Sequence, residues 1–214
     1  MATIVPGILT SDEEEYQRRL GIADHVCKLI QIDIVDGEFA NSLTVGPEII
    51  KKYPPSNFLE IQLMVVSPKK YIDSLAPLPY VSRVIFPFEV KEDISEALYA
   101  VKKHNKQVGI SINPETPVVA VKRLFDDVDL LLILAGKPGF SGQELGQWTY
   151  KKIEEAKRLD RGMAVEIDIG VNFENAAKLA GAGADFLVST SALFNSGDFR
   201  VAYEKLAKLA ANPQ

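Results

Sequence analysis

A pair of side chains able to do acid–base chemistry stands in the apolar segment L-I-Q-I-D-I-V-D-G-E-F, residues 29–39. Gln31 and Asp33 are two residues apart, and alternate side chains of a strand point to the same face, so an amide and a carboxylate reach one place. Gln62 lies in a second apolar run, L-E-I-Q-L-M, and Asp168 ends a third, A-V-E-I-D-I-G. Two carboxylates on opposite sides of a substrate could act as the acid and the base that move a proton between two faces of a carbon atom. Either aspartate taken alone is slightly better explained as a loop cap or as the partner of a lysine.

Glycine-rich turns follow three successive apolar runs near the end of the chain. They are G-K-P-G-F-S-G-Q at residues 136–143, the turn at Gly170, and S-T-S at residues 189–191. Backbone N–H groups in such turns can point at an anion without obstruction by side chains. One such turn is ordinary, but three on adjacent strands favour a phosphate site. The residues expected to bind the phosphate are Gly139, Ser141, Gly142, Gly170, Thr190 and Ser191.

Short runs rich in Ile, Val and Leu alternate with helical segments along the whole chain. The prolines Pro47, Pro68 and Pro117 stand where helices are expected to begin. The eight runs cover residues 3–9, 29–35, 58–64, 83–86, 108–112, 130–134, 164–168 and 186–189. This alternation predicts a (β/α)8 TIM barrel formed by one domain over residues 1–214, with a doubly wound open sheet as the alternative. Because the active site of such a barrel forms at the carboxyl ends of its strands, the carboxylates and the glycine-rich turns are expected on one face.

The composition limits the classes of partner. Hydrophobic residues make up 47% and charged residues 25% of the 214, which is typical of a soluble globular protein. The formal net charge of −5 argues against a nucleic-acid partner. No apolar run is long enough to span a bilayer, and the single cysteine, Cys27, with no signal-peptide pattern, favours the cytoplasm. The sequence leaves the oligomeric state open, a homo-oligomer included.

Several segments together resemble the ribulose-phosphate 3-epimerase family. They include I-V-P-G-I-L-T-S-D, Q-I-D-I-V-D-G-E-F-A-N-S-L-T-V-G-P, I-Q-L-M-V-V-S-P, K-P-G-F-S-G-Q and E-I-D-I-G-V, in family order over nearly the whole chain. The resemblance implies a barrel of the ribulose-phosphate-binding type and a small phosphorylated sugar as substrate. It also implies epimerisation of pentulose phosphates through an enediolate, with Asp33 and Asp168 as the acid/base pair and a divalent metal ion on the substrate oxygens.

This sequence departs from the family at the metal site. The family holds its metal with two histidines and the two aspartates, and the histidine positions are Gln31 and Gln62 here. Neither His25 nor His104 matches a site position. An amide oxygen is a poor ligand for zinc, iron or cobalt, so no transition-metal cofactor is expected. Two amides and two carboxylates could still hold Mg²⁺ or Mn²⁺, and that alternative stays open.

Further departures lie in the same pocket. A serine of the family is Gly7 here, a strand-four histidine is Pro87, and two motif glycines are Ile169 and Thr190. Two hypotheses therefore remain. The first is a metal-independent sugar-phosphate epimerase, in which Gly7, Gln31 and Gln62 contact the substrate and the amides polarise its carbonyl. The second is a non-catalytic phosphosugar-binding or scaffold protein derived from the family.

Overall fold

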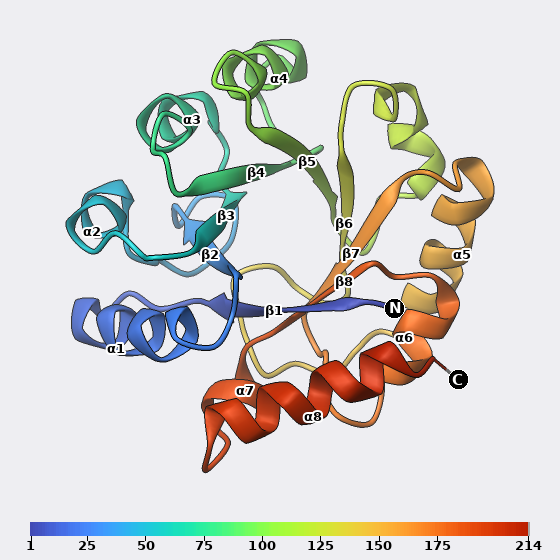
Figure 1. Cartoon of the computed structure of the whole chain (residues 1–214). Coiled ribbons are helices and arrows are strands. Elements are labelled where there is room, and N and C mark those ends of the chain that lie inside the picture. Colours follow the sequence, from blue (N-terminus) through green and yellow to red (C-terminus); the bar gives the residue numbers. More distant parts are fainter. Residues whose placement is uncertain (214) are drawn as a thin grey trace.

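The computed structural model describes residues 1–213, in which eight parallel strands close into a barrel (Figure 1). Each strand pairs with the next along the chain, and the first strand pairs with the last, with Val5 opposite Val188. The strands are β1 (Thr3–Ile8), β2 (Leu29–Val35), β3 (Phe58–Met64), β4 (Val81–Pro87), β5 (Gln107–Ile112), β6 (Leu130–Leu134), β7 (Ala164–Asp168) and β8 (Phe186–Ser189). The predicted (β/α)8 barrel is therefore confirmed, and the closing pair excludes the open sheet.

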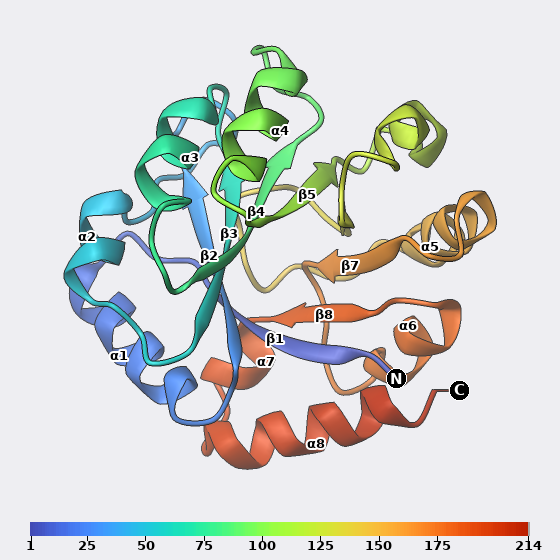
Figure 2. The same cartoon turned by 45° about the horizontal axis from the view of Figure 1, so that its top comes forward.

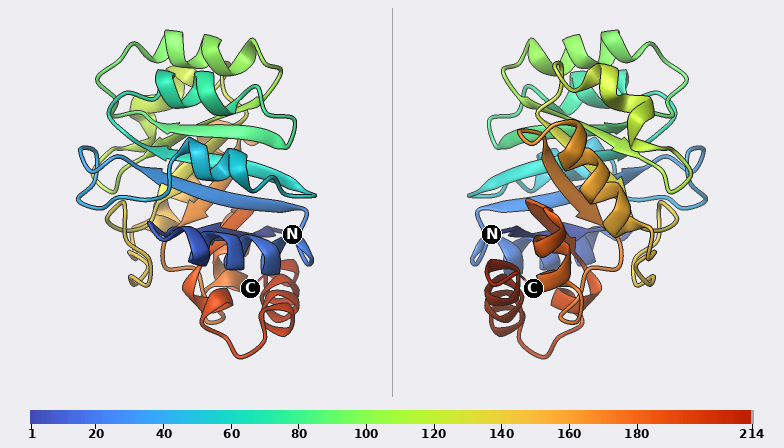
Figure 3. Two further views of the ribbon diagram at one scale, coloured as in Figure 1. Left: turned by 90° about the vertical axis from the view of Figure 1, so that its left-hand side faces the viewer. Right: turned by 90° about the vertical axis from the view of Figure 1, so that its right-hand side faces the viewer.

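Helices surround the barrel (Figure 2), and three of them begin after an aspartate whose side chain caps the first turn. They are α1 (Glu13–Asp24), α2 (Pro47–Lys52), α3 (Lys69–Leu75), α4 (Ile94–Lys102), α5 (Thr149–Leu159), α6 (Ala176–Ala182), α7 (Ser191–Phe194) and α8 (Phe199–Ala211). Asp12 accepts a hydrogen bond from the N–H of Glu15 at 2.7 Å, so its side chain caps the first turn of α1. The last helix packs beside the first strand (Figure 3), where Ala2 N donates to Ala210 O at 3.2 Å.

The segment after Pro117 differs from the expectation of an α-helix. Residues Val118–Leu124 form a 3₁₀ helix, η1. Its sequence, V-V-A-V-K-R-L, carries three β-branched valines, which lose side-chain freedom in an α-helix. The tighter 3₁₀ turn is common in such short connecting pieces. None of the helices in residues 1–213 is long and apolar enough to cross a membrane.

Most of the apolar core lies between the strands and the surrounding helices. A smaller apolar cluster fills part of the barrel interior, formed by Ile85, Leu130, Leu132, Leu134 and Ile169. It leaves the interior between β2, β3 and β7 to polar side chains. The barrel therefore has a polar column in its interior. The candidate site lies at the end of this column that is formed by the carboxyl ends of the strands.

Candidate active site

Strand register brings the polar residues of β2 and β3 side by side. Asp33 is opposite Gln62, and Gln31 is opposite Glu60. All four are buried, with exposed fractions of 0 to 4%. On β7, Glu166 and Asp168 repeat the same spacing of two residues. Because alternate side chains of a strand share a face, the polar residues form two layers in the barrel interior. The upper layer, at the carboxyl ends of the strands, has Asp33, Gln62 and Asp168, and the lower layer has Gln31, Glu60 and Glu166.

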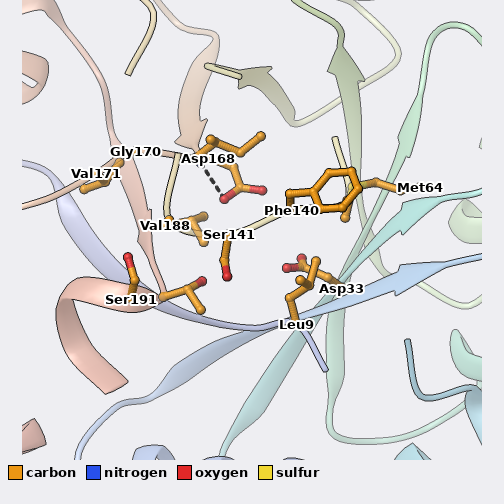
Figure 4. Close-up of a pocket in the computed structure, with 14 residues that line it drawn as sticks. Leu9, Asp33, Met64, Phe140, Ser141, Asp168, Gly170, Val171, Val188 and Ser191 are labelled. Carbon is orange, nitrogen blue, oxygen red and sulfur yellow. Dashed lines mark hydrogen bonds between the residues drawn. The ribbon is translucent and has the colours of Figure 1, made fainter. Parts of the chain in front are cut away.

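A cavity opens at the carboxyl ends of the strands, and both aspartates line it (Figure 4). Asp33 comes from β2 and Asp168 from β7, and their carboxylates point into the same space. Neither carboxylate has an ion-pair partner among residues 1–213. Leu9, Met64, Phe140 and Val188 add apolar wall around them. The expectation that the two carboxylates share one site therefore agrees with their placement.

Burial shifts the ionisation of both carboxyl groups. It raises the pKa of Asp168 to about 6, although the N–H of Ile169 and the amides of Gln62 and Gln31 oppose the rise. Burial also raises the pKa of Asp33 well above its ordinary value, and the nearby charge of Asp168 raises it further. Two interacting carboxyl groups of this kind can keep one proton between them, as an acid/base pair requires.

The two glutamine amides contact the carboxylates but are not part of the cavity wall. Gln31 Nε2 donates to Asp33 Oδ1 at 2.8 Å and to Gln62 Oε1 at 2.6 Å. If the Gln62 amide is turned so that its nitrogen faces the carboxylates, it donates to Asp33 Oδ1 and Asp168 Oδ2, each at 2.9 Å. Gln31 and Gln62 are fully buried and do not line the cavity, so direct contact of either with substrate stays a prediction.

The lower layer contains a buried ionic cluster that the sequence analysis did not identify. Arg83 Nη1 lies 2.8 Å from Glu60 Oε2 and 3.2 Å from Glu166 Oε2. Its guanidinium also packs on the ring of Phe186, 4.6 Å from the ring centre. Glu60 stands two residues before Gln62, so the same alternation that singled out Gln62 could have placed Glu60 in the barrel interior.

All six residues expected to bind phosphate line the same cavity as the carboxylates. Gly139, Gly142 and Gly170 have φ angles of +87°, +76° and +77°, a conformation that suits glycine. A Cβ atom on Gly170 would lie 2.6 Å from the backbone nitrogen of Leu145, so a side chain has no room there. Ser42 Oγ donates to the carbonyl of Gly139 at 2.8 Å and ties the β2–α2 loop to this turn.

Two departures from the family have visible structural consequences. Ile169 replaces a glycine and takes a φ of +79°, an unusual conformation for a β-branched residue, with its N–H donating to Asp168 Oδ1 at 2.7 Å. Gly7 does not line the cavity, so the structure does not bring it into contact with the rest of the expected substrate-binding surface. A Cβ atom on Gly7 would lie 2.7 Å from Thr190 Oγ1, so Thr190 fills the space beside Gly7.

A closed parallel barrel with a carboxylate pair beside glycine-rich turns defines a (β/α)8 protein with a candidate site for an anionic small molecule. Residues 3–194 match the sequence model described as the ribulose-phosphate 3 epimerase family. The chain belongs to the ribulose-phosphate 3-epimerase family, a family of isomerases.

Individual relatives agree with this membership. The ribulose-phosphate 3-epimerase of Bacillus subtilis (strain 168) is 31% identical over 218 aligned positions, which cover 96% of this chain and 98% of that protein. The ribulose-phosphate 3-epimerase of Serratia marcescens is 29% identical and covers 92% of this chain and 97% of that protein. Among solved structures, 3-hexulose-6-phosphate synthase from Salmonella typhimurium has a TM-score of 0.70 at 14% identity, with 99% of this chain and 100% of that chain covered. This last likeness is one of fold alone.

The transition metal that the family resemblance implies does not fit the side chains present. Zinc, iron and cobalt sites are built largely from nitrogen and sulfur ligands, and this cluster offers two amides and two carboxylates. Within the described part of the chain, no three His, Cys, Asp or Glu residues stand close enough to hold a metal ion. The amides instead hydrogen-bond with each other and with Asp33. These side chains therefore do not form a transition-metal site of the family's kind.

Proposed function

We propose that this chain interconverts pentulose phosphates that differ in configuration at C3, with Asp33 and Asp168 as the acid/base pair and without the transition metal of its family. The observation that carries the proposal is the placement of two carboxylates, from β2 and β7, on one cavity. Their raised pKa values supply the second support, because an acid and a base must coexist near neutral pH. The names of the relatives supply the substrate class.

The reaction needs one carboxylate and one carboxylic acid on opposite sides of C3. The ionised aspartate removes the C3 proton, and the electron pair of the C–H bond moves toward the C2 carbonyl to give an enediolate. The protonated aspartate then returns a proton to the opposite face of C3, and the carbonyl re-forms. The two aspartates exchange roles when the reaction runs in the reverse direction. No oxidant or reductant is needed, since the proton is the only group transferred.

The phosphate group would orient the sugar for this step. Gly139, Ser141 and Gly142 from the β6–α5 loop and Gly170, Thr190 and Ser191 from the next two loops face the same cavity as the aspartates. Backbone N–H groups and hydroxyls are suitable donors to phosphate oxygens. Binding at this end would fix the distance from the reacting carbon to both carboxyl groups.

Loss of the family's metal has a cost that can be bounded. A metal ion acting as a Lewis acid stabilises the developing oxyanion by several kcal/mol. If roughly 4–6 kcal/mol were lost without replacement, the rate would fall by about three to four orders of magnitude. We therefore expect slow turnover unless hydrogen bonds supply part of this stabilisation.

The test is incorporation of deuterium from D₂O into ribulose 5-phosphate and related ketose phosphates, with and without a chelator. Exchange that resists the chelator and disappears in Asp168→Asn would support a metal-independent enolising enzyme. Exchange that the chelator abolishes would overturn the metal-free part of the proposal. No exchange with any member of the panel, while phosphosugar binding persists, would favour the non-catalytic binding protein instead.

A further inference from the structure

The side chains of Asp33, Gln31, Gln62 and Asp168 form one continuous chain of close contacts. Gln31 Nε2 is 2.8 Å from Asp33 Oδ1 and 2.6 Å from the end of Gln62, and the same end of Gln62 is 2.9 Å from Asp168 Oδ2. The chain therefore runs from Asp33 through Gln31 and Gln62 to Asp168, and the same end of Gln62 also lies 2.9 Å from Asp33 Oδ1. It crosses the barrel interior from β2 through β3 to β7, and all four residues are at least nine-tenths buried.

Each contact in this chain needs one hydrogen between its two atoms. In the first arrangement, the two N–H groups of Gln31 Nε2 point at Asp33 Oδ1 and at Gln62 Oε1. The third contact, between Gln62 Oε1 and Asp168, then needs a hydrogen on the Asp168 carboxyl group. In the second arrangement, both amides are turned so that oxygen and nitrogen exchange places. Gln62 then donates to Asp168 and to Gln31 Oε1, and a hydrogen on Asp33 lies between Asp33 Oδ1 and Gln31 Oε1. Each arrangement leaves one aspartate ionised and the other protonated. The second also turns the Gln62 nitrogen toward Asp33 Oδ1, 2.9 Å away, so with Asp33 protonated and Asp168 ionised no two oxygens face each other without a hydrogen.

We propose that Gln31 and Gln62 are positioning residues whose amide groups form a bridge that links Asp33 to Asp168 and holds both carboxyl groups at the cavity wall. This amide bridge, defined as Gln31 and Gln62, stands where the family uses a metal ion with two histidines. It is neutral and supplies donors and acceptors in either direction. It therefore suits a pair of carboxyl groups that exchange roles in each direction of the reaction.

The energetic argument for the bridge is the cost of leaving a buried carboxylate without donors. Asp33 has no ion-pair partner in residues 1–213, and its side-chain donors are the amides of Gln31 and, when turned, Gln62. An unsatisfied buried polar group loses stabilisation that water would otherwise give. Removing the amides would leave the carboxyl groups free to rotate or to bind extra protons. Either change would misalign the carboxyl groups with C3 of the substrate or change their protonation.

The first test does not depend on turnover and measures zinc affinity by calorimetry after treatment with a chelator. The wild-type chain and the double variant Gln31→His/Gln62→His are compared. The amide bridge predicts no stoichiometric zinc site in the wild type and an affinity at least about 1,000-fold higher in the double variant, because four suitable ligands then converge. One zinc or magnesium ion per wild-type chain would overturn the proposal. So would a folded double variant that fails to bind zinc, since the four positions would then not converge.

The second test rests on the proposed function and uses Gln62→Met, which keeps the side-chain length and removes the hydrogen bonds. Loss of charge-assisted hydrogen bonds predicts a fall in kcat for deuterium exchange of about 10- to 100-fold with little change in KM. Ser111→Ala is the matched control, because Ser111 Oγ is a buried hydroxyl in the barrel with no hydrogen-bond partner in the described residues. A Gln62→Met enzyme with unchanged kcat would overturn the bridge and leave the proposed function standing. Absence of exchange in the wild type would refute the function, and the zinc test would still decide the bridge.

Discussion

Arg83 on β4 reaches across the barrel interior to Glu166 on β7, with Arg83 Nη1 3.2 Å from Glu166 Oε2. The same nitrogen lies 2.8 Å from Glu60 Oε2, so one guanidinium serves two buried carboxylates. Both glutamates have raised pKa values, chiefly because burial disfavours the charged form. The cluster lies directly beneath the carboxylates of the candidate site, which makes Arg83 the only cation within the described part of this column.

We expect Arg83→Met to lower the free energy of unfolding by about 3–5 kcal/mol at pH 7, because it leaves two buried carboxylates without their counter-charge. The loss should shrink at acidic pH, where protonated glutamates need no cation. Urea denaturation at several pH values measures both effects. Arg18→Ala is the control, since Arg18 pairs with Glu15 on the exposed surface of α1 and should change stability by less than about 1 kcal/mol. Equal losses for the two variants would contradict a structural role for the cluster.

The pH dependence of turnover should have an acidic limb near pH 6. Below that pH both aspartates carry a proton and no base is present, so kcat/KM should rise as Asp168, with its pKa of about 6, ionises. On the alkaline side the rate should fall when Asp33, whose pKa burial and the charge of Asp168 raise, loses its proton. A bell-shaped profile of kcat/KM for solvent deuterium exchange checks this expectation. A flat profile between pH 5 and 9 would show that the pair does not act as an acid and a base.

The strands could be located from the sequence because apolar runs and strand ends coincide in a barrel. The run at 29–35 is β2 to the residue, while the run at 83–86 begins two residues after the start of β4 because polar Ser82 interrupts the apolar pattern. The carboxylates and glycine-rich turns were also predictable, since chain order fixes which ends of parallel strands meet. Hydrogen bonding between Gln31 and Gln62 was not predictable, because it depends on the register of two strands and on which way each amide turns.

Replacing Asp168 by asparagine should stabilise the fold at neutral pH while it removes the acid/base pair. Asp168 has a folded pKa of about 6, above the ordinary value of 3.8, so the folded state binds its proton more tightly than the unfolded state. Stability from this group therefore falls as pH rises from about 4 to 6, and at pH 8 ionisation costs up to about 3 kcal/mol. Asp168→Asn avoids that cost. We expect a gain of about 1–3 kcal/mol at pH 8 that disappears below pH 4, measured by urea denaturation. A variant less stable than the wild type at pH 8 would contradict the raised pKa.

The space beside β1 should accept a side chain at position 7 only if Thr190 is reduced. A Cβ atom on Gly7 would lie 2.7 Å from Thr190 Oγ1 and 2.9 Å from Val188 Cγ1, so Gly7→Ser forces two neighbours to move. Overpacking of this kind costs about 1–3 kcal/mol of unfolding free energy. Thr190→Ala removes the nearer atom, so the double variant Gly7→Ser/Thr190→Ala should recover at least about 0.5 kcal/mol relative to the sum of the single changes. Gly197→Ser, where nothing lies within 4 Å of the added Cβ, is the control and should be nearly neutral. Additive effects at positions 7 and 190 would show that the two residues do not share this space.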